Sequence, residues 1–403
     1  MLTVGSGRSL SRRPVRAAKA TLAFFGLATV LIFVGCSSTP DYPPNLSFPS
    51  RTDRLVLKLP TTPPPGLSVA GEIVDELARL DAAGGQTFDP TTIPATNRTA
   101  LDRTLRDVFG TPGAPTVTLD ADVNATAERL GLVSDKLTEG SRLFRKQCLQ
   151  CHNLIGDGRG PAGLWVVPYP RDFRRGVFKF TTTGDVKPRR SDLLQTLHEG
   201  LKGTAMPSFG QLPEPERELL ARFATYLAIR GQVEFDTLAA LSLGGVPDVS
   251  GFANARVKAI TGVWERAENA PQFAGLSAVP DDGEPASPNH EAAVRRGYAL
   301  FTAKADNSCI SCHGEFGRKP VLRYDVWGTV AKPADLSVPN VFKGGKRPED
   351  VFVRIRGGIS AVGMPAHPEL SDRQVWDLVR FVRSIPYPRE LPADVRAVVY
   401  PNP

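Results

Sequence analysis

The chain has 403 residues, of which 41% are hydrophobic and 23% are charged. This length and hydrophobic content leave room for two or three domains that each bury a core of their own. The formal net charge is +7, but part of it comes from a basic segment at the N-terminus, so we exclude a nucleic-acid partner. The 37 glycines and 36 prolines indicate long irregular connections between the elements.

Residues 1–35 have the features of an export signal, which is kept apart from the fold. An apolar stretch from Thr21 to Val34 follows a basic start. The junction Phe33-Val34-Gly35-Cys36 resembles the bacterial lipoprotein signal, which implies acylation of Cys36. The resemblance predicts an exported protein anchored in the membrane on the periplasmic side. An uncleaved signal anchor and a soluble secreted product are the alternatives.

The next two segments carry no cofactor motif. Residues 36–67 are rich in proline, and we predict the lipid anchor followed by an extended spacer. Residues 68–133 are predicted to form a small helical region, with short amphipathic helices over 69–80 and 98–109. This region is expected to form either a cap on the following domain or a docking surface.

A first domain is predicted over residues 134–231, around the sequence Cys148-Leu149-Gln150-Cys151-His152. Cys-x-x-Cys-His is the sequence form of a covalently held c-type haem. The two thiols add to the haem vinyl groups, and His152 reaches the iron. Met206, in Met206-Pro207, can close the sixth iron position with a thioether that favours ferrous iron. Helices are predicted over 191–200 and 215–229.

A second domain is predicted over residues 289–388, after a connector over 232–288. The connector holds one helix, 252–269, which is expected to bridge the two domains. The second domain contains Cys309-Ile310-Ser311-Cys312-His313, with Met364-Pro365 about fifty residues later. Cys309, Cys312, His313 and Met364 are therefore predicted to hold a second haem. Helices are predicted over 348–357 and 372–384, and residues 389–403 form a C-terminal tail.

Other roles for these residues explain the pattern less well. Cys-x-x-Cys alone is compatible with a thioredoxin-type redox pair or half of a zinc site, but neither accounts for a histidine after the second cysteine on both occasions. Most methionines are core residues, yet apart from the initiator the chain has only Met206 and Met364. His198 and His367 compete as distal ligands, although they occupy unrelated positions in the two halves.

An internal repeat relates the two predicted domains. A shift of 158 residues, the separation of Met206 and Met364, aligns a long stretch without a gap. It places identical or similar residues on one another at six further positions, namely Asp192 on Asp350, Leu197 on Ile355, Gly200 on Gly358, Leu212 on Leu370, Leu220 on Leu378 and Phe223 on Phe381. The halves are therefore two versions of one domain.

Each half resembles the class I c-type cytochromes, with Gly140-x-x-x-Phe144 and Gly297-x-x-x-Phe301 ahead of the two haem motifs. The resemblance implies a mainly α fold with two tandem class I cytochrome c domains and long irregular loops, beside the small N-terminal helical region. It implies that the glycine lets an N-terminal helix cross a C-terminal helix closely. It further implies that a proline carbonyl, from Pro161 or Pro320, accepts the proton on the other nitrogen of the ligand histidine.

A second resemblance concerns the partners. The stretches 170–180 and 203–207 are similar to bacterial c-type cytochromes that accompany quinol:acceptor complexes (alternative complex III) or terminal oxidases. This implies a membrane-associated redox partner of that class. Four basic residues in and near these stretches either pair with haem propionates or form an exposed face. They are Arg171, Lys179, Arg189 and Arg190.

The sequence thus predicts a two-haem protein that transfers single electrons in a respiratory or other periplasmic redox chain, and that is not itself an enzyme. One alternative is an enzyme, a dihaem peroxidase-like protein with an open distal position on one iron. Another is a fixed haem subunit of a dehydrogenase or oxidase complex.

Overall fold

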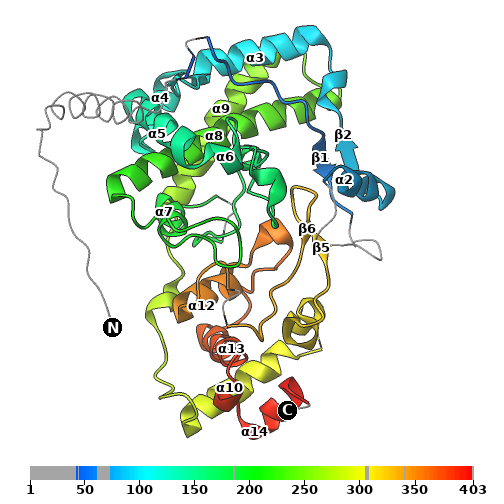
Figure 1. Cartoon of the computed structure of the whole chain (residues 1–403), viewed down its shortest axis with the longest axis vertical. Helices are drawn as coiled ribbons and strands as arrows, with labels where there is room; N and C mark the ends of the chain where they lie inside the picture. The colour runs from blue at the N-terminus through cyan, green and yellow to red at the C-terminus, as the bar shows by residue number, and fades with distance from the viewer. Residues whose placement is uncertain are drawn as a thin grey trace, which may run out of the picture. The chain divides into compact units, whose positions relative to one another are not determined.

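Helices dominate the computed structural model, which describes residues 42–43, 45–60, 73–184, 187–304, 308–339 and 342–401 (Figure 1). The predicted leader, residues 1–35, and the predicted lipidation site Cys36 lie outside the described residues. All described residues fall within a single compact unit. None of the helices in these ranges combines the length and the apolar character that a membrane crossing needs.

The first haem domain is built on the crossing of α5 (Ser134–Gln147) and α8 (Glu214–Ser242) (Figure 1). Gly140 lies at the crossing, because a Cβ atom there would stand 2.6 Å from the carbonyl oxygen of Leu219. One turn further along, the rings of Phe144 and Phe223 pack with their centroids 5.2 Å apart. The predicted glycine crossing is confirmed in this half.

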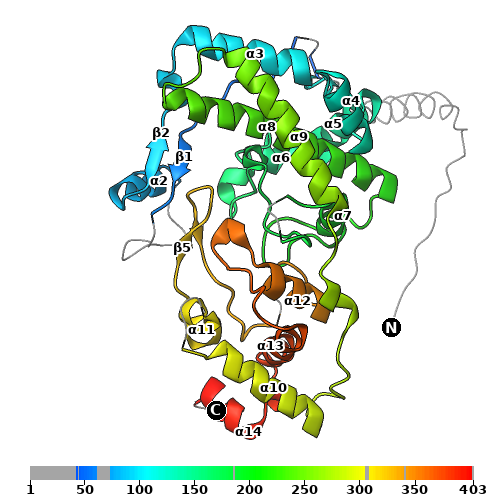
Figure 2. The ribbon, with the colours of Figure 1, turned by 180° about the vertical axis from the view of Figure 1, so that it is seen from behind.

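The second haem domain repeats the arrangement with α10 (Pro288–Phe301) and α13 (Asp372–Ser384) (Figure 2). A Cβ atom on Gly297 would stand 2.1 Å from the carbonyl oxygen of Asp377. The ring centroids of Phe301 and Phe381 are 5.4 Å apart. The side chain of Ser371 accepts a hydrogen bond from the N–H of Gln374, so that α13 begins where the sequence predicts.

A shorter helix packs on the C-terminal helix of each domain, α7 (Arg190–Glu199) in the first and α12 (Pro348–Gly357) in the second. Asp192 and Asp350 begin the two helices in the same way. Their carboxylates accept the backbone N–H of Arg189 at 2.9 Å and of Arg347 at 3.0 Å. The gap-free repeat in the sequence is therefore also a repeat in three dimensions.

The region before the first haem domain packs onto it as a cap. Buried apolar residues of α3 (Ala95–Phe109) and α4 (Ala121–Arg129) belong to the same hydrophobic core as α5 and α8. Tyr226 of α8 donates a hydrogen bond from its hydroxyl to the carbonyl of Phe109 at 2.5 Å. The cap prediction is confirmed. The other elements of this region are β1 (Leu55–Lys58), α2 (Ile73–Ala82), β2 (Gln86–Phe88), η1 (Pro90–Thr92), β3 (Gly110–Thr111) and β4 (Ala114–Pro115).

Residues 45–60 differ from the predicted spacer, because they are packed rather than extended away from the protein. Leu55 is fully buried, and β1 pairs with β2 in an antiparallel ribbon. The backbone N–H of Arg51 donates to the carboxylate of Glu234 at 2.8 Å. Pro49 and Pro60 lie on either side of β1, and they do not prevent the residues between them from joining the core.

The prediction that residues 232–288 form a connector is wrong for its first part, residues 232–242, which continue the helix α8. α8 continues to Ser242, and its last turns bury Val233 and Leu238 against α9 (Val249–Asn269). α9 packs on α3, α4 and α8, so it does not bridge the two haem domains. The helical periodicity was readable in both segments, but the partner of each apolar face was not.

The second domain has a separate core, formed by α10, α12, α13 and the C-terminal helix α14 (Ala393–Val399). A hairpin of two short strands, β5 (Arg323–Tyr324) and β6 (Val330–Ala331), belongs to this domain. Tyr324 joins Val56, Leu77 and Leu80 in a small apolar cluster, so the hairpin contacts the N-terminal region.

Candidate functional site

The two Cys-x-x-Cys-His motifs each form a single helical turn. In the first half this turn, α6 (Leu149–His152), follows directly after α5. In the second half it is α11 (Cys309–Cys312). The N–H of His152 donates to the carbonyl of Cys148, and that of His313 to the carbonyl of Cys309, both at 2.8 Å. Positions three and four residues apart on a helix are neighbours, so each turn brings two thiols and one imidazole together.

The four motif cysteines are free thiols. Burial, and next the neighbouring motif thiol, raise the pKa of Cys148 to about 12. Burial raises the pKa of Cys309 to about 11. A catalytic redox pair needs a lowered pKa, because the thiolate is the nucleophile. Cys148 and Cys309 therefore lack the lowered pKa of a thioredoxin-type nucleophile.

Each motif histidine donates its Nδ1–H to a backbone carbonyl. His152 Nδ1 lies 3.1 Å from the carbonyl oxygen of Arg171, and His313 Nδ1 lies 3.1 Å from that of Ala334. Since a carbonyl only accepts, Nδ1 carries the proton and Nε2 is left with its lone pair, as an iron ligand requires. Burial lowers the pKa of His152 to about 4, against the effect of its hydrogen bond, and also lowers the pKa of His313.

The prediction that Pro161 or Pro320 supplies this carbonyl is wrong. In the first half the loop after the motif folds back onto α6, where the N–H of Ala162 donates to the carbonyl of Gln150 at 2.8 Å. Gly160 allows this close approach, because a Cβ atom there would stand 2.4 Å from the same carbonyl oxygen. Pro161 therefore lies in the loop that covers the motif, and the accepting carbonyl comes later in the chain.

The segments that supply the carbonyls are two equivalent straps, residues 170–173 and 333–336. Both have the sequence Pro-x-Asp followed by an apolar residue. Asp172 and Asp335 each accept the backbone N–H two residues on, at 2.9 Å and 3.0 Å. Phe173 and Leu336 are buried. This shared Pro-x-Asp pattern is the sequence feature that would have identified the straps.

The two Met-Pro sequences lie in loops of the same construction. Gly200 and Gly358 end the preceding helices with φ values of +67° and +68°, in the left-handed region that favours glycine. The N–H of Leu201 donates to the carbonyl of Met206 at 3.2 Å, and the N–H of Ile359 to that of Met364 at 3.0 Å. Both methionines are half-buried. The competing histidines have no such symmetry, since His198 is exposed and His367 binds Glu369 at 2.8 Å.

The basic residues considered as propionate partners have carboxylate or structural contacts. Arg171 and Lys179 lie 3.5 Å and 3.6 Å from the buried carboxylate of Asp325 in the second domain. Burial, and next the charge of Arg171, lower the pKa of Lys179 to about 7. Arg190 pairs with Glu218 and Glu268, while the backbone of Arg189 caps α7. Pairing of these side chains with propionates stays a prediction.

Both motifs fit a covalently attached haem by the chemistry of their donors. Each offers two thiols outside any disulfide, and an imidazole whose Nδ1 is already engaged by a carbonyl. The haem would be held by Cys148, Cys151 and His152 in one half and by Cys309, Cys312 and His313 in the other. The sequence motifs singled out these six residues, and their role as haem-holding residues stays a prediction. Sequence reasoning missed the straps and the contacts that Asp325 and Trp327 make across the two domains.

Comparisons with known proteins agree with the repeat. The family model described as subunit III of cbb3-type cytochrome c oxidase matches residues 135–224 and, a second time, residues 292–382. Each matched segment contains one Cys-x-x-Cys-His motif and one Met-Pro. No curated protein matches the chain. A solved structure of the reducing HAO-like protein complex of Kuenenia stuttgartiensis is similar, with 26% identity and a TM-score of 0.43, over 61% of this chain and 95% of that chain.

Proposed function

We infer the mode of electron transfer from one premise. The protein contains two tandem cytochrome c domains and, with them, two c-type haems. We propose that it is a dihaem carrier in which each iron has one histidine and one methionine ligand. When bound, the haems supply the one-electron chemistry, between ferric and ferrous iron. The observation that supports this best is the equivalence of the two halves, in the histidine-to-strap hydrogen bond and in the methionine loop.

In this proposal each group of the chain has one role. Cys148 and Cys151 attach the first haem, His152 is its proximal ligand and Met206 its distal ligand. The second set is Cys309, Cys312, His313 and Met364. The strap carbonyls hold the imidazole rings in one tautomer and one orientation and increase their basicity. The polypeptide thus fixes the ligands and their polarity, so that little needs to move when an electron arrives.

The equivalent methionine loops also weigh against a peroxidase-like enzyme. Such an enzyme needs an open or displaceable distal position on one of its two irons. In both loops a glycine with positive φ, Gly200 or Gly358, precedes the residue whose N–H donates to the methionine carbonyl, which supports the same ligand role for both methionines. An oxidised protein without the methionine-to-iron absorption band would favour the enzyme.

The family description supports a partner of the oxidase class. The matching model belongs to an oxidase subunit. We propose that the chain exchanges electrons with a terminal oxidase or a quinol:acceptor complex at the membrane surface, either as a carrier or as a fixed haem subunit of the complex. Co-purification of the complex from detergent-solubilised membranes would indicate the fixed subunit.

The number and identity of the haem sites can be tested by removing one motif. The double variant Cys148→Ala/Cys151→Ala is expected to keep the second haem only, because each thioether bond needs a cysteine thiol and both thiols of the first motif are removed. Haem content per chain, measured by pyridine haemochrome absorption after acid-acetone extraction, should fall from two to one. Cys309→Ala/Cys312→Ala is the matched variant and should also leave one. An unmodified protein that loses all colour on extraction would contradict the assignment of both sites.

The proposed anchor is tested at Cys36. Acylation of this residue would hold the protein at the periplasmic face of the membrane. Cys36→Ser is therefore expected to move the haem-stained band from the membrane to the soluble fraction, or to leave an unprocessed precursor. Ser38→Ala, a substitution two residues after Cys36 that leaves every haem-motif cysteine in place, serves as the control and should remain in the membrane. A Cys36→Ser protein with both the distribution and the size of the unmodified protein would rule out the lipid anchor.

A further inference from the structure

The turn between β5 and β6 of the second domain is organised by one buried carboxylate. Asp325 is 2% exposed and accepts the backbone N–H groups of Trp327 at 3.1 Å and Thr329 at 3.0 Å. It also accepts the hydroxyl of Thr329 at 2.9 Å. Gly328 takes φ +79° at the tip, where a Cβ atom would stand 2.9 Å from a side-chain carbon of Val56. The turn is thus shaped to fit against the N-terminal region.

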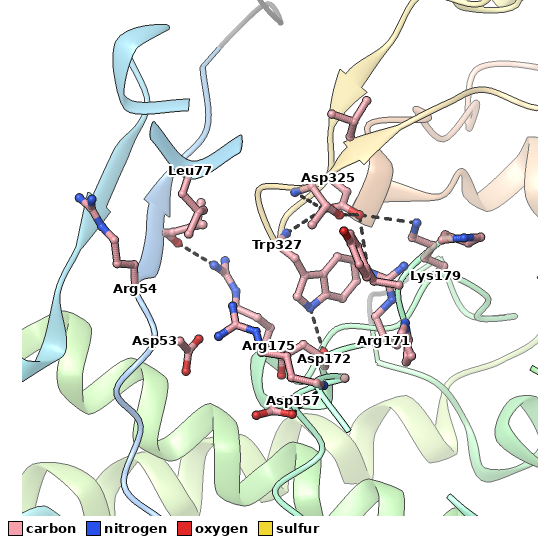
Figure 3. A pocket seen from close by; sticks show the side chains of 18 of the residues that line it. Asp53, Arg54, Leu77, Asp157, Arg171, Asp172, Arg175, Lys179, Asp325 and Trp327 are labelled. Carbon is pink, nitrogen blue, oxygen red and sulfur yellow. Dashed lines mark hydrogen bonds and ion pairs between the residues drawn. The ribbon is translucent and has the colours of Figure 1, made fainter. Parts of the chain in front are cut away.

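This turn also docks on the first strap, the segment that holds His152 (Figure 3). The indole N–H of Trp327 donates to the carbonyl of Asp172 at 2.8 Å. The guanidinium of Arg171 lies 3.6 Å from the centre of the Trp327 ring, a cation–π contact. The same guanidinium lies 3.5 Å from the carboxylate of Asp325. Trp327 and Asp325 of the second domain therefore contact the side chain of Arg171, and Trp327 also binds the carbonyl of the next residue in the strap.

The first strap is also held by the N-terminal region, through Arg174. Arg174, which is 1% exposed, binds Asp53 with two hydrogen bonds of 2.7 Å and 3.0 Å, and binds Asp172 at 2.7 Å. The strap is therefore held at Asp172 by Arg174, and at Arg171 and Asp172 by the second domain. The carbonyl of Arg171, which accepts from His152, belongs to the segment between these two anchors.

The second strap has no comparable external support among the residues that the structure describes. Ala334, which accepts the hydrogen bond from His313, has no side chain that a ring or a carboxylate could hold. Asp335 accepts from the backbone and hydroxyl of Ser337, and the N–H of Leu336 donates to Phe316. All these partners belong to the second domain. The two haem sites are therefore equivalent in their ligands but different in what holds the proximal strap.

We propose that Trp327 and Asp325 of the second domain are positioning residues for His152, so that the reduction potential of the first haem depends on the β5–β6 turn. This rests on the assignment of His152 as the proximal ligand. A carbonyl held firmly against Nδ1–H makes the imidazole a stronger donor and stabilises ferric iron. Loosening the strap weakens that hydrogen bond and raises the potential of the first haem. The second haem keeps its own strap and its own potential.

The test uses the full-length protein with both haems attached. Trp327→Phe keeps a ring under Arg171 and removes the indole N–H, and Asp325→Asn keeps a side chain of the same shape and removes the charge. In a spectroelectrochemical titration each variant is expected to raise the potential of the first haem and to leave the second unchanged. Electron paramagnetic resonance of the ferric protein should show changed g values for the first haem alone, because these report the orientation of the imidazole ring.

Tyr387→Phe is the control, since Tyr387 is 48% exposed in the second domain and makes none of these contacts. It should reproduce the unmodified protein. Unchanged potentials and g values in both variants, with two haems present, would overturn the positioning role while leaving the proposed electron transfer intact. Equal shifts of both haems would overturn it as well, since they indicate a general change in the protein. Failure to find two histidine-ligated haems in the unmodified protein would instead contradict the proposed function.

Discussion

Met206→Ala is expected to lower the reduction potential of the first haem and to leave that of the second unchanged. A thioether ligand favours ferrous iron, and its loss allows water or a harder ligand to take the sixth position and stabilise ferric iron. Axial ligands shift haem potentials over a range of about 0.8 V, so we expect a decrease on the order of 0.2 V. Potentiometric titration followed by visible absorption measures it, because the two haems then separate into two waves.

Substitution of the other methionine, Met364, tests the ligand assignment independently. Met364→Ala should lower the other potential, and each variant should lose about half of the methionine-to-iron absorption band of the oxidised protein. His198→Ala is the control, because His198 is exposed on α7 and is the competing distal residue of the first half. A titration of Met206→Ala that matches the unmodified protein, or a large shift in His198→Ala, would remove Met206 as the ligand.

Gly297→Ala is expected to destabilise the second haem domain and to reduce its haem content. The added Cβ atom would stand 2.1 Å from the carbonyl oxygen of Asp377 and 2.8 Å from the Cβ of Phe381, so α10 and α13 would have to separate. Forcing one extra carbon into a packed interior costs about 1–3 kcal/mol and occasionally more. The backbone oxygen cannot move aside as a flexible side chain can, so we expect the upper part of that range. Urea unfolding followed by circular dichroism measures the loss.

Gly262→Ala is the matched control for this substitution. Gly262 also lies within a helix, α9, but the nearest atom to an added Cβ is the Arg266 guanidinium nitrogen at 3.5 Å. Replacing a glycine by alanine in a helix interior stabilises the helix by roughly 0.5–1 kcal/mol. The two substitutions should therefore move the unfolding midpoint in opposite directions. A Gly297→Ala protein as stable as the unmodified one would show that the two helices do not need the close crossing.

Much of the local structure was readable from the residues themselves. The helices predicted over 348–357 and 372–384 are found with those bounds, and the gap-free shift of 158 residues maps helix onto helix and loop onto loop. The haem motifs work at short range, since a spacing of three and four residues fixes two thiols and an imidazole on one turn. These features depend on residues that are close together in the sequence, so they can be predicted from the sequence.

The errors concern contacts between distant segments. The strap carbonyl lies 19 residues after His152 and 21 after His313, and the intervening loops have different lengths and contents. A proline near the motif was a reasonable expectation, but the loop after the first motif is used to cover α6. The proline-rich residues 45–60 and the last turns of α8 were misplaced for a similar reason. Their apolar faces are visible in the sequence, but the surfaces that bury them are not.

The sequence by itself therefore determined the chemistry of this protein: the two haem motifs, the methionines that match them, and the duplication of one helical domain. Only the tertiary structure decided how the two copies differ. The indole of Trp327 meets the carbonyl of Asp172 across 155 residues of chain. Such a contact depends on how two domains and an N-terminal segment pack, and no periodicity or spacing encodes it. Each haem motif is a property of five adjacent residues, whereas the support of its histidine is a property of the whole fold.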